Sequence, residues 1–358
     1  MTSPQVALPA PSSRSRRPFD FRIPITLCVI AVLCGFFWIG SRYPSLQGKA
    51  SADPNEALST PLGFERFFPE PPADQRLKHI AWTAAEWGIT NRQGMTYGLL
   101  LAAAMMTILP LVRRRPGGKL AGALQGMVIG TPLGVCVNCA APIAQGMIKG
   151  GGRVETALAT LVSSPTFNVI VLGIVFTLFP WYLAVTKVLA GVFIVLVIVP
   201  WLARLAERPG WSRAQPVEPR LPGLYLFQKL EAVLGTPQLA GEAERPPPWG
   251  PVRALGWVAL HYVRNLGRVL VTALPLMLLA GVLGAILVEI LPWNVLNHVS
   301  HVEGGAANAA VLLLAGIFGV LLPVPMAFDV VVCSVLLGAG MPVPVVAVLL
   351  VTLGTYSI

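Results

Sequence analysis

The chain has 358 residues, of which 55% are hydrophobic and only 12% are charged, and its mean hydropathy is +0.70. Average soluble domains carry roughly twice that charged fraction, so the composition excludes a water-soluble fold. The formal net charge of +10 does not indicate a nucleic-acid partner, because the basic residues lie in short polar stretches between apolar runs, as the positive-inside rule predicts.

Long apolar runs predict an all-α fold. Hydrocarbon offers no hydrogen-bond partners, so the backbone inside a membrane must be helical or buried within a protein bundle. We therefore predict a polytopic helix bundle in the lipid bilayer that contains broken or re-entrant helices. All five cysteines lie inside apolar segments, which indicates reduced thiols rather than a disulfide framework.

The N-terminal end predicts a disordered cytoplasmic tail and one retained helix. Residues 1–22 are rich in Pro, Ser and Arg. The apolar run at 23–40 is longer than a signal-peptide core and no small-residue cleavage site follows it, so we expect a membrane helix there. Basic clusters at 14–22 and 113–119 predict a cytoplasmic N-terminus in a multi-pass protein of a bacterial inner membrane.

A first membrane unit is predicted at residues 23–203. It includes an extracytoplasmic loop at 41–92, a helix at 93–112, and a segment at 120–148 that glycine and proline interrupt. Basic residues flank this segment on both sides, which favours a re-entrant hairpin over a broken spanning helix. A helix at 154–178, broken at 163–168, and another at 181–203 complete the unit.

A cytoplasmic linker and a second membrane unit are predicted next. The linker at 204–264 is rich in Pro and Arg, with a short helix at about 223–234. The second unit, 265–358, begins with a helix at 269–291 and an outer loop that carries His298, His301 and Glu303. Histidines in a solvated loop are usually polar surface, so we predict no metal site.

From residue 309 the design of the first unit recurs. An apolar segment is broken by Pro323 and Pro325, and a helix follows the Gly-Ala-Gly sequence at 338–340. Aligning 150–152 with 338–340 pairs Ser164 with Thr352. The charge rule places the two broken segments on opposite membrane faces, which predicts an inverted repeat with its substrate site near the midplane. Because the chain stops in an apolar run at 356–358, we expect the second unit to lack its last helix.

Two cysteines form the most informative pattern in the sequence. Cys136 and Cys139 are three residues apart, so on a helix they share a face and can bind one ligand, with Asn138 and Pro142 beside them. Half-helix N-termini in a hairpin favour thiolates, which select soft species such as trivalent arsenic or copper(I). Simple packing of a small apolar side chain is the alternative role.

A polar cluster breaks the next helix. It consists of Ser163, Ser164, Pro165, Thr166 and Asn168. Proline frees an upstream carbonyl, and the hydroxyl and amide groups either repair that break or contact a solute. We predict that Ser163, Ser164, Pro165 and Asn168 line the transport path.

One acidic residue lies in the apolar segment that follows Pro325. An ionisable side chain at membrane depth indicates function, so Asp329 is predicted to be a proton-coupling or cation site. The alternative is that the break brings Asp329 near solvating water. Cys333, four residues later, is a candidate third sulfur.

These residues resemble a predicted bacterial permease family that includes organoarsenical efflux permeases. The resemblance rests on Pro132-Leu-Gly-Val-Cys-Val-Asn-Cys-Ala-Ala-Pro142, on Gly150-Gly-Gly-Arg153, and on Ala157-Leu-Ala-Thr-Leu-Val-Ser-Ser-Pro-Thr-Phe-Asn168. It covers residues 93–202 well and 265–358 more loosely. The resemblance implies a secondary transporter that exports trivalent organoarsenicals without ATP hydrolysis, and no Walker-type sequence is present.

The sequence therefore predicts a non-enzymatic permease for a small thiophilic solute, without a cofactor and with no defined oligomeric state. A membrane thiol oxidoreductase that uses the Cys136–Cys139 pair is the alternative. A non-transporting assembly factor or sensor that docks through the polar loops is a third class.

Overall fold

The computed structural model describes residues 20–44, 67–69, 71–72, 75–112, 117–206, 250–290, 305–321, 328–338 and 340–355. Their regular structure is helical throughout, which confirms the all-α prediction. Within these described ranges, three helices are long and apolar enough to cross a membrane: residues Arg22–Arg42, Trp181–Ala206 and Pro251–Ile286. The expected helix at 223–234, the loop with His298, His301 and Glu303, and the prolines at 323 and 325 lie outside the described residues.

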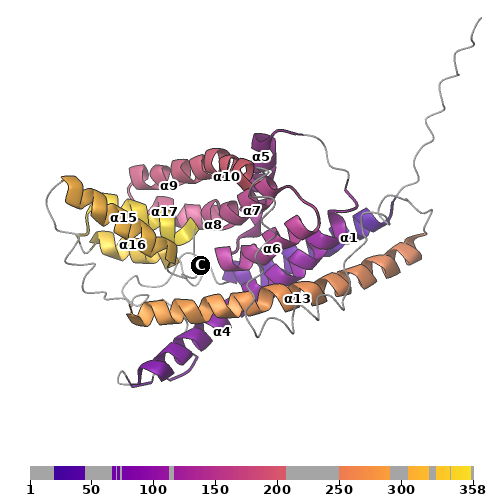
Figure 1. Cartoon of the computed structure of the whole chain (residues 1–358), viewed down its shortest axis with the longest axis horizontal. Coiled ribbons are helices and arrows are strands. Elements are labelled where there is room, and N and C mark those ends of the chain that lie inside the picture. Colours follow the sequence, from indigo (N-terminus) through magenta and orange to yellow (C-terminus); the bar gives the residue numbers. More distant parts are fainter. Residues whose placement is uncertain are drawn as a thin grey trace, which may run out of the picture.

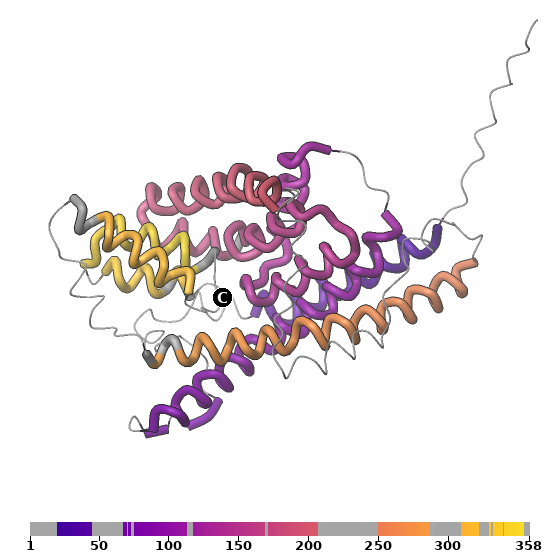
Figure 2. The backbone as a smooth tube through the Cα atoms, in the orientation of Figure 1, coloured from indigo at the N-terminus to yellow at the C-terminus, as the bar shows by residue number. Residues whose placement is uncertain are grey.

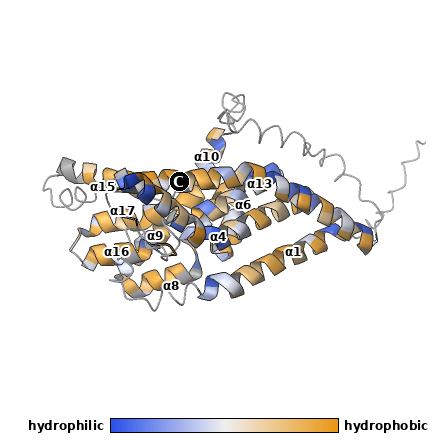
Figure 3. Ribbon diagram, turned by 90° about the horizontal axis from the view of Figure 1, so that it is seen from below, coloured by the Kyte–Doolittle hydropathy of each residue, from blue (hydrophilic) through white to orange (hydrophobic). Residues whose placement is uncertain are grey.

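The first half of the chain begins with α1 (Arg22–Phe37), which continues as a π-helical turn, η1 (Trp38–Arg42). α4 (Arg76–Ile108) packs against α1 and against α13 (Pro251–Ile290), which runs along both in Figures 1 and 2. Exposed apolar side chains cover the outer face of α1 and η1, where Val32, Phe36 and Ile39 are 68%, 82% and 80% exposed. The ribbon in Figure 3 shows that hydrophobic residues also predominate along α13 and the C-terminal helices, as expected for a protein that contacts lipid.

Two helix starts differ from the sequence-based prediction. The helix expected at 93–112 begins at Arg76, so the end of the predicted 41–92 loop is helical. The helix expected at 269–291 begins at Pro251, within the predicted linker. Both added segments carry charged residues beside good helix formers. A hydropathy pattern shows only the apolar part of a helix, whereas the helix itself continues through polar residues.

The predicted hairpin at 120–148 is two helices with a break between them. α5 (Lys119–Gly130) ends in a short 3₁₀ turn, η2 (Thr131–Leu133), and α6 (Val137–Lys149) follows. α5 packs closely on α7 (Val154–Thr166) through Gly122, Gly126 and Gly130. A Cβ at Gly130 would lie 2.9 Å from Cβ of Ser163. A stripe of small residues of this kind lets two membrane helices approach at backbone distance.

The remaining helices complete the bundle. α8 (Val169–Leu178) follows α7 at an angle of 45°, which confirms the predicted break near the Ser-Pro sequence. α9 (Trp181–Phe193), the π-helical turn η3 (Ile194–Ile198) and α10 (Val199–Ala206) form one long span. α15 (Gly305–Leu321), α16 (Phe328–Gly338) and α17 (Val343–Thr355) lie together beside α8 and α9 (Figure 1).

The turns before α7 and α17 have the same structure. Gly151 has φ 81° and Gly340 has φ 87°, a region that favours glycine. In the first turn, the N–H of Gly151 donates to the carbonyl of Ile148 and the N–H of Gly152 donates to that of Met147. In the second turn, Gly340 donates to Leu337 and Met341 donates to Leu336. The four residues that form these bonds in the first turn precede their counterparts in the second turn by the same number of positions. The helices that follow, α7 and α17, both have 13 residues.

This equivalence corrects the predicted repeat alignment by one residue. Gly151 corresponds to Gly340, so Thr352 is paired with Ser163 rather than with Ser164. Both members of that pair pack on a glycine two helices earlier, Ser163 on Gly130 of α5 and Thr352 on Gly319 of α15. The sequence alignment matched glycines by identity, whereas only the glycine with positive φ is fixed by the backbone.

Candidate functional site

The two cysteines lie at the start of α6 because the chain stops and restarts its helix there. Pro132 lies at the beginning of the 3₁₀ turn, and Gly134 adopts a left-handed conformation with φ 61°. Cys136 is the extended N-cap residue of α6, and Cys139 lies in the first turn of that helix. This arrangement places both sulfurs at a half-helix N-terminus, where the helix dipole favours negative charge.

The thiols form a close, buried pair. The Sγ atoms of Cys136 and Cys139 are 3.0 Å apart, and the residues are 8% and 1% exposed. Two glycines of α4 make room for them: a Cβ at Gly94 would lie 2.8 Å from Sγ of Cys139, and one at Gly98 would clash with its carbonyl oxygen. The prediction that these cysteines share a face is therefore confirmed.

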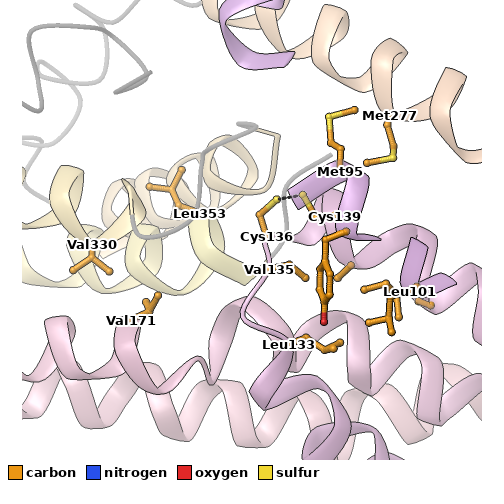
Figure 4. Close-up of a cluster of buried hydrophobic side chains, with 14 of the residues drawn as sticks. Met95, Leu101, Leu133, Val135, Cys136, Cys139, Val171, Met277, Val330 and Leu353 are labelled. Atoms are coloured by element: carbon orange, nitrogen blue, oxygen red, sulfur yellow. Dashed lines mark hydrogen bonds between the residues drawn. The ribbon is translucent and has the colours of Figure 1, made fainter. Parts of the chain in front are cut away.

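Two methionines belong to the buried cluster that contains the thiol pair. Met95 of α4 and Met277 of α13 are drawn with the cysteines in the close-up of that cluster (Figure 4). They are 6% and 5% exposed. Thioether sulfur is soft and polarisable, so this surrounding suits a thiophilic ligand better than a hard cation.

A positive charge also lies close to the thiols. Arg42, the last residue of η1, interacts electrostatically with both thiols and with Tyr97. Its Nε atom is buried and has no hydrogen-bond partner among the described residues. The Tyr97 ring stacks on Phe37 at 4.0 Å, and its hydroxyl lies 3.2 Å from Sγ of Cys34. Sequence analysis missed Arg42, although its position at the end of the first apolar run was a signal.

The Ser-Pro break of α7 packs directly behind the thiol segment. Ser164 Oγ accepts a hydrogen bond from the Val135 N–H at 3.2 Å and donates to the Val135 carbonyl at 3.1 Å. Asn168 is buried, and its Nδ2 would lie 3.1 Å from a Cβ at Gly134. The structure thus brings the two predicted motifs together through the backbone at 134–136.

The other predicted residues of this region differ in their roles. Ser163 Oγ is buried without a hydrogen-bond partner among the described residues, whereas Ser164 repairs the backbone. Pro165 and Pro142 are buried inside α7 and α6. Asn138 is half-buried in the first turn of α6.

Asp329 is not part of the thiol site. It lies in the first turn of α16, and its Oδ2 is 2.8 Å from Nζ of Lys187 on α9. The Lys187 ammonium also donates to the carbonyl of Leu350 on α17 at 2.7 Å. Asp329 is 3% exposed, which argues against the alternative that water solvates its charge; Lys187 pairs with it instead. Sequence analysis treated this aspartate as isolated and overlooked Lys187, although that lysine is an obvious charge within an apolar run.

The described residues contain no group of three or more His, Cys, Asp or Glu side chains that could hold a metal ion. Cys333 therefore does not add a third sulfur to the thiol pair. It is instead a buried neighbour of Asp329 on α16.

Comparison with known proteins identifies the family of the chain. A family model described as "Predicted permease" (ArsP_1) matches residues 95–354, which include the thiol pair, the Ser-Pro break and Asp329. The UPF0718 protein YraQ of Escherichia coli (strain K12) is 26% identical over 266 residues. That match covers 73% of this chain and 66% of the relative, slightly less than two thirds of its length. No solved structure matches the chain.

The family model matches most of the chain, and several helices are apolar enough to cross a membrane. The chain is a multi-pass membrane protein that belongs to the predicted permease family.

Proposed function

We propose that the protein is a secondary transporter that exports a small thiophilic solute, such as a trivalent organoarsenical, across the bacterial inner membrane. The observation that carries this proposal is the thiol pair, whose sulfur atoms lie 3.0 Å apart at a helix break inside the bundle. Two sulfurs at that separation can bind one soft atom together.

Binding of a trivalent arsenical would be a reversible exchange. Each thiol of Cys136 and Cys139 gives its proton to a hydroxyl group on arsenic, two water molecules leave, and two As–S bonds form. No electron is transferred, so no redox partner is needed. The reverse exchange with water releases the solute on the other side of the membrane.

The environment of the pair supports solute binding. Met95 and Met277 provide soft sulfur in the same buried cluster, and Arg42 provides a positive charge that complements negative charge on the ligand or on the sulfurs. Ser163 has a buried hydroxyl without a partner among the described residues, which makes it available to a solute. The other predicted residues belong to the two motifs that meet here, at the start of α6 and at the end of α7: Asn138, Pro142, Ser164, Pro165 and Asn168.

A thiol oxidoreductase fits the structure less well. Such an enzyme exposes its thiols to a partner, whereas Cys136 and Cys139 are almost completely buried. The family match is to permeases and gives no support to redox catalysis. We propose further that the N-terminus is cytoplasmic and that Asp329 couples transport to protons.

Accumulation of trivalent methylarsenite in everted membrane vesicles tests the proposal. We expect wild-type vesicles to accumulate the solute and the variants Cys136→Ser and Cys139→Ser to lose at least nine-tenths of that uptake. Cys28→Ser is the matched control, since Cys28 is exposed on α1 and is not part of the thiol pair. Equal uptake by all four proteins would exclude a thiol-dependent permease for this solute.

A further inference from the structure

A buried ion pair connects three helices of the bundle. Lys187 comes from α9, Asp329 from α16, and the Leu350 carbonyl from α17. The side chains of the lysine and the aspartate are 1% and 4% exposed. A charge inside a membrane protein is costly unless it is paired, so these three groups hold their helices together.

Asp329 of the ion pair lies at the start of α16, and the thiols lie at the start of α6. The turns after α6 and α16 are equivalent, and both helices end at equivalent positions. Counting back from those turns, Asp329 near the start of α16 corresponds to Ala140, the residue that follows Cys139 in α6. The two halves thus place different chemistry at neighbouring positions of the repeat.

The groups around the Asp329 carboxylate can be named for the described part of the chain. Lys187 approaches from α9, Cys333 lies one turn away on α16 itself, and α17 contributes only a backbone carbonyl. α8 also packs on α16 and has no titratable side chain, because its sequence is Val-Ile-Val-Leu-Gly-Ile-Val-Phe-Thr-Leu. The lysine is therefore the counter-charge of this carboxylate.

This environment suits a proton rather than a metal cation. Calcium and magnesium need six or more oxygen ligands, and the described residues gather no cluster of acidic side chains around Asp329. The Lys187 ammonium already occupies the place that a cation would take. A proton needs only one carboxylate oxygen and can displace the ammonium from it.

We propose that Lys187 and Asp329 form the proton switch of the transport cycle, an inference that rests on the proposed transport function. When Asp329 is ionised, its bond to Lys187 locks α9 to α16 and α17. A proton from water that binds Asp329 Oδ2 neutralises the carboxylate, breaks the ion pair and frees α16 to move. The same proton leaves to the opposite side when the pair forms again, so one proton crosses per cycle.

The test uses the full-length protein in proteoliposomes and the variants Lys187→Met, Asp329→Asn and Lys187→Met/Asp329→Asn. Exchange of labelled methylarsenite with unlabelled solute measures movement without a driving force, and uptake driven by a pH gradient measures coupling. Each single variant leaves one buried charge unpaired and should lose both activities. The double variant should keep exchange within threefold of wild type and lose at least nine-tenths of the gradient-driven uptake.

Lys149→Met is the matched control, since Lys149 is an exposed lysine on α6 that does not contact the ion pair. It should retain both activities. Gradient-driven uptake by the double variant at the wild-type level would refute the switch. Loss of exchange in a correctly folded double variant would refute it too, because the pair would then be required for solute movement itself.

A readout without solute separates this inference from the proposed function. The proposed switch requires that protonation of Asp329 break its bond to Lys187. Acidification should therefore lower the melting temperature of wild type more than that of the double variant. If wild type neither exchanges nor accumulates methylarsenite but shows this difference, the proposed solute is wrong and the switch stands. Equal acid sensitivity of both proteins would contradict the switch.

Discussion

Two neighbouring hydroxyl groups on α7 have different environments. Ser164 Oγ bonds to both the N–H and the carbonyl of Val135, whereas Ser163 Oγ is buried with no partner among the described residues. The first hydroxyl replaces backbone hydrogen bonds that the break removes. The second has the unused bonding capacity that a solute contact requires.

Alanine substitution of each serine separates these roles. Ser164→Ala leaves the buried Val135 N–H unpaired and should destabilise the protein by about 1–3 kcal/mol. Ser163→Ala should leave the melting temperature within a degree or two of wild type and reduce methylarsenite uptake severalfold. Thermal melting of the purified proteins and vesicle uptake check both statements. A larger loss of stability in Ser163→Ala than in Ser164→Ala would reverse the assignment.

Sequence analysis predicted the local part of the site and missed the distant part. The three-residue spacing of Cys136 and Cys139 predicted that their sulfurs lie together, as they do with Cys136 at the N-cap of α6, and the prolines marked the breaks. Arg42 and Lys187 are brought to their partners by tertiary packing, over a separation of 142 residues in the case of Lys187 and Asp329. Such contacts leave no periodic pattern in a single sequence. Only the rarity of charge in apolar runs pointed to them.

At the scale of helices, contact between α4 and α6 holds the thiol pair in place. The Cys139 carbonyl lies against Gly98, and Gly146 of α6 lies against Ala102 of α4. Small residues on both helices bring the two backbones into contact, so no flexible side chain can move aside to make room for an added group. A single added methyl group would have to move α6 and its two sulfurs.

Gly98→Ala tests this contact, and Gly88→Ala on the same helix is its control. The Cβ at position 98 would clash with the Cys139 backbone, so we expect a loss of about 1–3 kcal/mol and weaker solute uptake. A Cβ at position 88 meets nothing within 4 Å, and alanine there should be neutral or stabilising by up to about 1 kcal/mol. Melting temperatures measure the difference, and a tolerated Gly98→Ala would show that α6 is not fixed by α4.

The sequence also predicted the breaks of the helices better than their ends. α5 ends where Pro132 and Gly134 predicted a break. The proline ring and the left-handed glycine restrict the backbone at their own positions, so their effect can be predicted from the local sequence. The starts of α4 and α13 were missed since their polar first turns lie outside the apolar runs. The division into two membrane units at 23–203 and 265–358 stays a prediction.

At the scale of the whole molecule, the inverted repeat makes a prediction about sidedness. Lys149 and Gly338 are the last residues of α6 and α16, they are exposed, and they precede equivalent turns. If the repeats have opposite topology, these positions lie on opposite faces of the membrane. The sequence predicts Lys149 on the cytoplasmic side.

Labelling of introduced cysteines measures that sidedness. In a Cys28→Ser background, we expect a membrane-impermeant maleimide to label Lys149→Cys in everted vesicles and Gly338→Cys in right-side-out cells. Labelling of both variants from the same face would exclude an inverted repeat. The buried cysteines at 136, 139 and 333 should react much more slowly in both preparations.

The distance in sequence between Lys187 and Asp329 has a consequence for synthesis of the protein. Translation adds roughly 5–20 residues per second, so the ribosome needs roughly 7–30 s to make the 142 residues that separate the two partners. During that time α9 carries an unpaired ammonium group. We expect α9 to wait at the membrane surface or within the insertion machinery until α16 emerges, which makes this helix a late step in assembly of the bundle.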